Sequence, residues 1–182
     1  MNINNIDKAR KFLDFNNRFY TLELIGRSKD KNYDDLDVIA IPIFEINAYN
    51  QISNLLASYC DKLNTRLYLS LNGISYEDSL QKTKSLLNHP YATDLDKCRM
   101  LGNYYKYDTK NYKYILIDID DMSEYELILE KLKYYNIEPI EIFDSKTGKH
   151  IIINRDDAYK VNLFKYYHNS CRILLYYNDL KK

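Results

Sequence analysis

Three side chains in the second half of the chain have the types and spacing of a metal–phosphate site. Asp118 and Asp120 end an apolar run at 114–120, and His150 starts another apolar run after a turn at 144–149. Alternate residues of a strand point to one face, so we expect both carboxylates to share a face. Neighbouring carboxylates repel each other unless a cation lies between them, and Mg²⁺ or Mn²⁺ prefers carboxylate oxygens. A histidine on an adjacent strand could then hold a phosphate that the same cation contacts.

The elements that must position these residues follow from the pattern after residue 111. Apolar runs, turn residues and helical spacing predict strands at 112–119, 137–143, 150–154 and 172–177, and helices at 124–135 and 157–164. Ser123 and Glu126 have the spacing of a capping box at the start of the first of these helices. The order β-α-β-β-α-β is that of a ferredoxin-like or RRM-like sheet. Its first and third strands are neighbours, which would bring Asp118, Asp120 and His150 onto adjacent strands.

The first half of the chain predicts a second α/β unit. We expect helices at 6–16, 49–63 and 76–87, the last beginning after Ser75, and strands at 19–25, 38–46 and 66–71. Residues 90–111 are the least regular part. The predicted class is therefore α/β (α+β), with an N-terminal α/β unit at 1–111 and an RRM-like palm at 112–182. The palm has a largely antiparallel sheet, and the two units form one compact domain.

Composition narrows the classes of function. The chain has 182 residues, 46% of them hydrophobic, which is enough for a substantial core. Its 26 basic residues balance 26 acidic ones, which argues against a protein that coats nucleic acid without specificity. No run approaches the roughly 20 apolar residues that span a bilayer. We expect reduced thiols, a cytoplasmic location and no membrane association; the cysteines are Cys60, Cys98 and Cys171.

Two segments resemble the motifs of a known superfamily. The Tyr-Ile-Leu-Ile-Asp-Ile-Asp segment at 114–120 and Gly148-Lys149-His150 are similar to the first two motifs of the archaeo-eukaryotic primase superfamily, which includes the primase-polymerases. The resemblance implies an RRM-like palm in which Asp118 and Asp120 bind metal and His150 contacts the phosphates of the incoming nucleotide. The third motif of the superfamily is a late aspartate after an apolar residue. Here the candidate is Asp179, which follows Asn178.

The resemblance also implies an activity. The chain would be a primase-polymerase-like nucleotidyltransferase that uses Mg²⁺ or Mn²⁺ and a nucleoside triphosphate to extend single-stranded or primed nucleic acid. The metal ions would stabilise the attacking and leaving oxygens. A replication protein is a further partner that this activity implies. The chain is short, and its many Tyr, Asn, Lys and Ile residues suggest an AT-rich genome. Both features are similar to those of small phage and plasmid members of the superfamily, so the cytoplasm would be that of a host.

Basic residues could add contacts to this site. Lys146, Lys149 and Arg155 flank His150 and could neutralise a triphosphate, or they could be solvated turn residues. Residues 97–113 interleave cations with tyrosines, as a surface for a single strand would. Because the chain has 20 tyrosines, chance is the favoured explanation of that pattern.

Two other functions fit the same residues. An apolar strand that ends in Asp-x-Asp is common and often caps the following helix. The imperfect third motif favours a palm-like module that binds a nucleotide, a nucleic acid or a protein without turnover. The same carboxylates could also serve a metal-dependent nuclease or phosphodiesterase.

Overall fold

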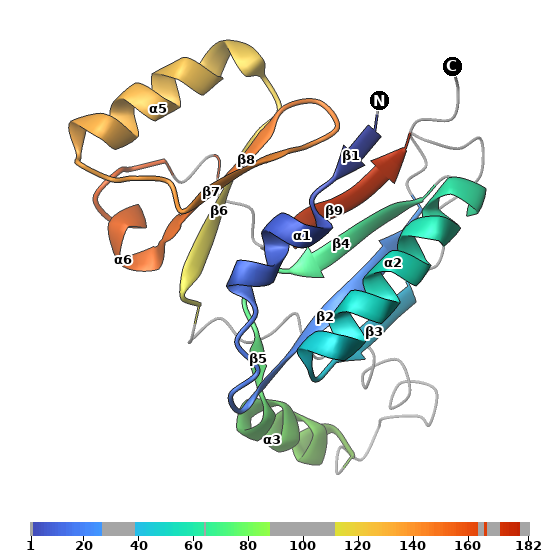
Figure 1. Ribbon diagram of the computed structural model, residues 1–182. Coiled ribbons are helices and arrows are strands. Elements are labelled where there is room, and N and C mark those ends of the chain that lie inside the picture. The colour runs from blue at the N-terminus through green and yellow to red at the C-terminus, as the bar shows by residue number, and fades with distance from the viewer. Residues whose placement is uncertain are drawn as a thin grey trace.

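The fold is a mixed α+β arrangement of two antiparallel sheets, which confirms the predicted class (Figure 1). We analysed a computed structural model that describes residues 2–26, 39–63, 65–87, 112–163, 166 and 172–178. None of the helices in these ranges is long and apolar enough to cross a membrane.

The larger sheet is built from both ends of the chain. Its order is β1-β9-β4-β2-β3, and β5 pairs with β2 outside this path. The strands are β1 (Asn2–Asn4), β2 (Arg18–Ile25), β3 (Ile39–Ile43), β4 (Arg66–Ser70), β5 (Ile74–Ser75) and β9 (Arg172–Asn178). The described pairings of this sheet are antiparallel.

The smaller sheet carries the candidate site. Its order is β6-β8-β7, formed by β6 (Tyr114–Ile119), β7 (Glu141–Asp144) and β8 (Lys149–Asn154). The predicted neighbours, the first and third strands of the palm, do pair. The fourth expected strand does not join them, because β9 lies between β1 and β4 in the larger sheet. There Ile173 and Leu175 enter the main core, and Leu175 accepts a hydrogen bond from the backbone of Asn5 (2.7 Å).

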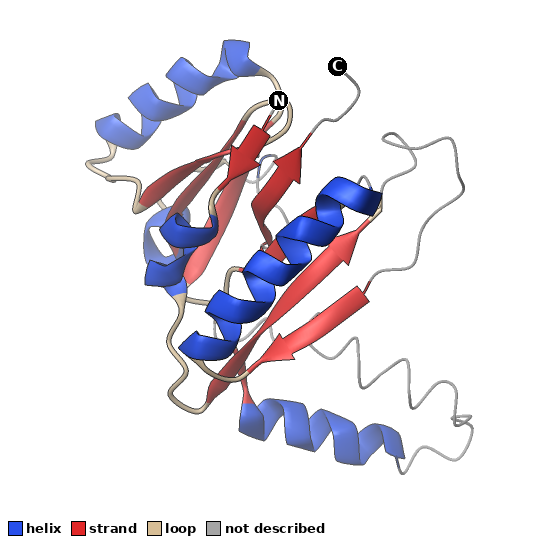
Figure 2. Cartoon of the chain, turned by 45° about the vertical axis from the view of Figure 1, so that its right-hand side comes forward, coloured by secondary structure: helices blue, strands red, loops and turns tan. Residues whose placement is uncertain are grey.

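The helices cover the two sheets separately. Figure 2 shows α2 (Ile46–Leu63) lying across one face of the larger sheet and α5 (Tyr125–Tyr134) lying over the smaller one. The remaining described helices are short or peripheral: α1 (Ile6–Ala9), η1 (Arg10–Phe12), α3 (Tyr76–Leu87), η4 (Met122–Glu124) and α6 (Arg155–Ala158). The predicted helix at 6–16 is thus shorter, since Leu13 is already extended.

One of the two predicted helix caps is found. The backbone N–H of Asp78 donates to Oγ of Ser75 (3.0 Å), which caps α3 as expected. The capping box at Ser123 is wrong. The chain enters α5 through the 3₁₀ turn η4, and the Asp121 carboxylate accepts from the N–H of Ser123 (2.9 Å). Glu124, rather than Ser123, therefore stands at the N-cap of α5.

The two faces of the smaller sheet contribute side chains to two separate hydrophobic cores. On one face Leu116, Phe143 and Ile152 join the main core, where the Phe12 ring packs edge-on against Tyr114 with centroids 5.2 Å apart. The other face packs against α5 and α6 and holds Ile117, Ile119, Ile151 and Ile153 with Ile128 and Leu132. Because strand residues alternate, this division decides which face each candidate residue occupies.

Candidate functional site

Asp118 and His150 form the centre of the candidate site. They are register partners on β6 and β8, and Nε2 of His150 lies 3.3 Å from Oδ1 of Asp118. The histidine side chain is 9% exposed and the aspartate side chain 26% exposed. Nδ1 of His150 is buried and has no hydrogen-bond partner among the described residues. A nearly buried imidazole therefore lies behind a carboxylate that reaches solvent.

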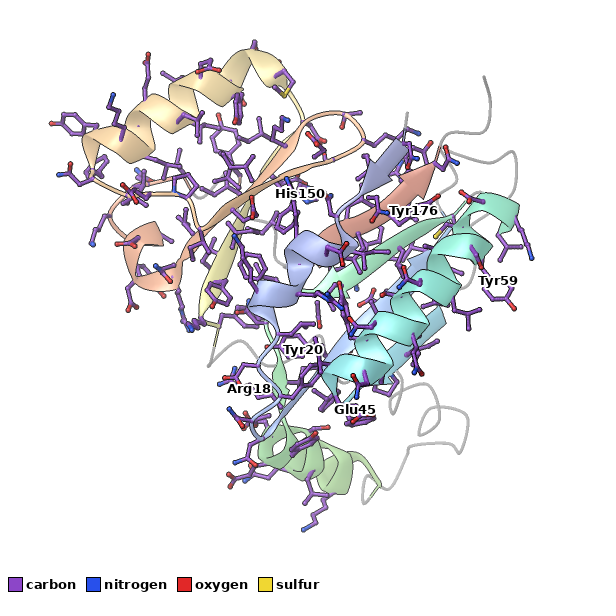
Figure 3. All side chains as sticks on the ribbon, viewed as in Figure 1. Arg18, Tyr20, Glu45, Tyr59, His150 and Tyr176 are labelled. Atoms are coloured by element: carbon purple, nitrogen blue, oxygen red, sulfur yellow. The ribbon has the colours of Figure 1, made fainter. Side chains whose placement is uncertain are left out.

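The surroundings of His150 are apolar. Phe143 is its register partner on β7. Ile152 lies two residues further along β8, and Leu116 is the register partner of Ile152 on β6. All three side chains are buried. Figure 3 shows His150 on the side of β8 away from α5, toward β1 and α1. An apolar environment strengthens electrostatic interactions, so the carboxylate and imidazole interact more strongly here than they would in water.

Asp120 lies just beyond the last residue of β6 and is exposed. Its Oδ1 accepts a hydrogen bond from Oγ1 of Thr147 (2.8 Å), in the turn between β7 and β8. Hydrogen bonds between Ser145 and Gly148 close that turn: the Ser145 N–H donates to the Gly148 carbonyl, and the Gly148 N–H donates to Ser145 Oγ, both at 3.0 Å. The turn thus holds the Asp120 carboxylate in place. Thr147 was not predicted from the sequence, although a hydroxyl residue in a turn close to a carboxylate is a common hydrogen-bond donor.

Gly148 brings the turn against the end of β6. A Cβ atom at this position would lie 1.8 Å from the carbonyl oxygen of Ile119 and 3.2 Å from Cα of Asp120. Only a residue without a Cβ permits this approach. Position 148 is therefore a glycine because the turn contacts the backbone of Ile119, the residue between the two aspartates.

The structure does not gather the three predicted cations around His150. Lys149 lies on the opposite face, where it pairs with Asp144, and this hydrogen bond raises the pKa of the Lys149 ammonium. Lys146 places Nζ 5.0 Å from the centroid of the Tyr177 ring on β9. Arg155 lies at the far end of β8, about 16 Å from His150 for five residues of strand, where its Nε donates to the Tyr159 hydroxyl (3.1 Å).

Tyr177 is a second feature that sequence reasoning missed. Its ring is buried and has Cζ of Arg66 5.2 Å from its centroid, in addition to Lys146. Both distances are typical of cation–π contacts. The contact with Lys146 joins the β7–β8 turn to the larger sheet. Local sequence gave no signal, because the contact depends on β9 joining a different sheet from the one predicted.

Among the described residues, the predicted metal ligands are Asp118 and Asp120. Asp179 lies outside the described part of the chain, as do residues 97–111 of the basic, tyrosine-containing segment. Within the described ranges no group of three or more His, Cys, Asp or Glu side chains is placed to hold a metal ion. The carboxylates of Asp118 and Asp120 have the chemistry of ligands for Mg²⁺ or Mn²⁺, and both reach solvent.

The fold and site define a class: a mixed α+β protein in which an aspartate and a histidine pair on adjacent strands of a three-stranded antiparallel sheet, with a second aspartate just beyond the end of the first strand. No protein-family model matches the chain, and neither does any curated protein or solved structure with which it was compared.

Proposed function

We propose that the chain is a metal-dependent nucleotidyltransferase of the primase-polymerase type, with its active site at the end of β6. The observation that supports this best is the pairing of Asp118 with His150. The two motifs are distant in the sequence, yet their defining residues lie opposite each other on adjacent strands. Gly148 and Thr147 add two further contacts between the same two segments.

The carboxylates of Asp118 and Asp120 would hold the Mg²⁺ or Mn²⁺ ions. Such ions, when bound, stabilise charge on the attacking and leaving oxygens of phosphoryl transfer. The chain's own contribution is to fix the two ligands. Thr147 holds Asp120 through its hydroxyl group, and the contact of Gly148 with Ile119 keeps the turn beside both aspartates.

The burial of His150 and its closeness to Asp118 support a positioning role for this residue. Its imidazole lies behind Asp118 and is 9% exposed, so it limits the directions that the carboxylate can take. Contact with a nucleotide phosphate, which the superfamily resemblance implies, would require the imidazole to become more exposed. Because Lys149, Lys146 and Arg155 contact other groups, we leave them out of the proposed phosphate site.

Nucleotide incorporation tests the proposal. Purified protein is incubated with labelled deoxynucleoside or ribonucleoside triphosphates, primed and unprimed templates, and Mg²⁺ or Mn²⁺. We expect extended products, and we expect Asp118→Asn and Asp120→Asn to abolish them while circular dichroism and thermal melting show an intact fold. Asp121→Asn is the matched control, since this neighbouring carboxylate caps η4 and lies outside the proposed pair. Absence of product under every condition, or equal activity in all three variants, would overturn the proposal.

A second function is a palm-like module that binds a nucleotide without turnover. The closeness of His150 to Asp118 favours it, because the imidazole already provides the carboxylate with a partner inside the protein. Calorimetry would then detect nucleotide binding that persists in Asp118→Asn, with no product in the incorporation assay. Loss of labelled substrate without nucleotide addition would instead identify a nuclease or phosphodiesterase.

A further inference from the structure

Three aromatic rings from separate segments pack together near α3, two of the three pairs stacked and one tilted. Phe19, Phe44 and Tyr76 have ring centroids 5.5, 5.9 and 6.2 Å apart in pairs, with angles between ring planes of 35°, 24° and 12°. Phe44 is 53% exposed and Tyr76 41% exposed. We call these three residues the aromatic platform. Large exposed rings gathered at one place are typical of interaction surfaces.

The backbone fixes the aromatic platform. Phe19 is on β2, where it pairs with Ile74 of β5, and Tyr76 begins α3 immediately after β5. The backbone N–H of Tyr76 donates to the carbonyl of Asn17 (3.1 Å), which holds the start of α3 against β2. Phe44 directly follows β3, which is paired with β2. The rings are therefore presented by ordered strands and a helix start, so little conformational entropy is lost when a ligand binds.

Two glutamates and one arginine adjoin the residues of the aromatic platform in the sequence. Glu45 follows Phe44, Glu77 follows Tyr76, and both glutamates are exposed. The guanidinium of Arg18, the described cation nearest in sequence to Phe19, lies 3.5 Å from the carbonyl oxygen of Gly73. Exposed carboxylates that follow two of the three rings in the sequence repel phosphate groups, which disfavours a nucleic-acid strand stacking here. They attract cations, and the faces of aromatic rings do the same.

We propose that the aromatic platform docks an arginine-containing segment of a partner protein. A guanidinium stacks on aromatic faces and pairs with carboxylates in a fixed geometry, so it matches both features of this surface. The exposed Leu80, one helical turn after Tyr76, would add apolar contact beside the rings. The proposal is independent of the nucleotidyltransferase activity, since Figure 3 places Glu45 and Arg18 toward α3, away from His150.

Fluorescence anisotropy with the full chain tests the docking. The probe is a labelled synthetic peptide of alternating arginine and glycine. We expect Phe44→Ala and Tyr76→Ala each to weaken its binding by about 3- to 30-fold, the range for loss of a cation–π contact. Phe44→Leu should weaken it nearly as much, because leucine keeps apolar bulk but has no ring face. Tyr134→Ala is the matched control, since that ring on α5 is 81% exposed and outside the platform.

Charge variants and other probes complete the test. Glu45→Gln should weaken peptide binding and reduce its dependence on salt, while Glu126→Gln on α5 should leave both unchanged. A lysine–glycine peptide should bind more weakly than the arginine peptide. The proposal is overturned if the arginine peptide does not bind, or if it binds wild type and the platform variants equally. It is also overturned if oligothymidylate binds through these rings in its place, or if Phe44→Ala abolishes self-association of the chain and leaves peptide binding unchanged.

Discussion

The carbonyl oxygen of Ile119 occupies the space that a side chain at position 148 would need. A Cβ atom on Gly148 would lie 1.8 Å from that oxygen, far inside any normal contact distance. Because the oxygen belongs to the backbone of β6, it cannot rotate away as a side chain could. The turn between β7 and β8 must therefore shift if residue 148 is anything but glycine.

Gly148→Ala should destabilise the protein through this overlap. We expect the free energy of unfolding to fall by about 1–3 kcal/mol, the range for overpacking in a closed contact, as measured by urea denaturation. Gly73→Ala provides a comparison, since its Cβ would meet a side-chain atom of Tyr20 at 2.9 Å. An alanine at 148 that costs no more than one at 73 would contradict the close approach.

Asn72 links the two sheets, and its loss should be costly. Its Oδ1 accepts from the backbone N–H groups of Lys113 and Tyr114 at 3.0 Å, and its Nδ2 donates to the Tyr114 carbonyl at 2.9 Å. Asn72→Ala should lower the free energy of unfolding by about 1–3 kcal/mol, because the partly buried backbone groups of Lys113 and Tyr114 lose their partner. Asn72→Asp should not recover this loss, because its second carboxylate oxygen would face the Tyr114 carbonyl, which also accepts. Asn54→Ala, which removes an exposed bond within α2, is the control.

Glu23 and Arg172 form an ion pair within the larger sheet. The Glu23 side chain is fully buried, and its Oε2 lies 3.0 Å from Nη2 of Arg172. Arg172→Met should lower the free energy of unfolding by about 3–5 kcal/mol, because it removes one partner of a buried charge pair. The double variant with Glu23→Gln should recover part of this loss in the same urea titration. If the double variant is less stable than the single one, the buried charge is not the cause.

Cys60 should be an unreactive thiol in the folded protein. Burial raises the pKa of its thiol to about 11, which outweighs the lowering effect of the neighbouring Thr65 side chain. At pH 8 only about one molecule in a thousand would then carry the reactive thiolate. Iodoacetamide labelling followed by mass spectrometry of the Cys60 peptide should show slow modification in buffer and rapid modification in urea. Equal rates in both would contradict burial of the thiol.

Local patterns in the sequence predicted most of the elements near the site. The predicted strands at 112–119 and 150–154 correspond to β6 and β8, and the helix predicted at 124–135 corresponds to α5. The regular spacing of apolar residues and the clear apolar runs made these elements predictable. The order of the elements also predicted that Asp118 and His150 lie on adjacent strands, and they are register partners in the structure.

Contacts between distant segments could not be predicted from local sequence patterns. Strand β1 is a short segment in which one apolar residue lies between two asparagines, and it forms a strand by pairing with β9. The sheet to which β9 belongs is decided by that pairing and by β4, neither of which appears in the local pattern around Arg172–Asn178. The opposite directions of Lys149 and His150 could have been predicted, because adjacent residues of a strand face opposite sides.

A manganese titration followed by electron paramagnetic resonance tests the central claim most directly, because it needs neither a template nor turnover. We predict that the wild-type chain binds Mn²⁺, that Asp118→Asn and Asp120→Asn each weaken this binding at least tenfold, and that Asp121→Asn leaves it unchanged. Absence of bound Mn²⁺ in the wild-type protein, or equal binding in all three variants, would contradict a metal site at the end of β6.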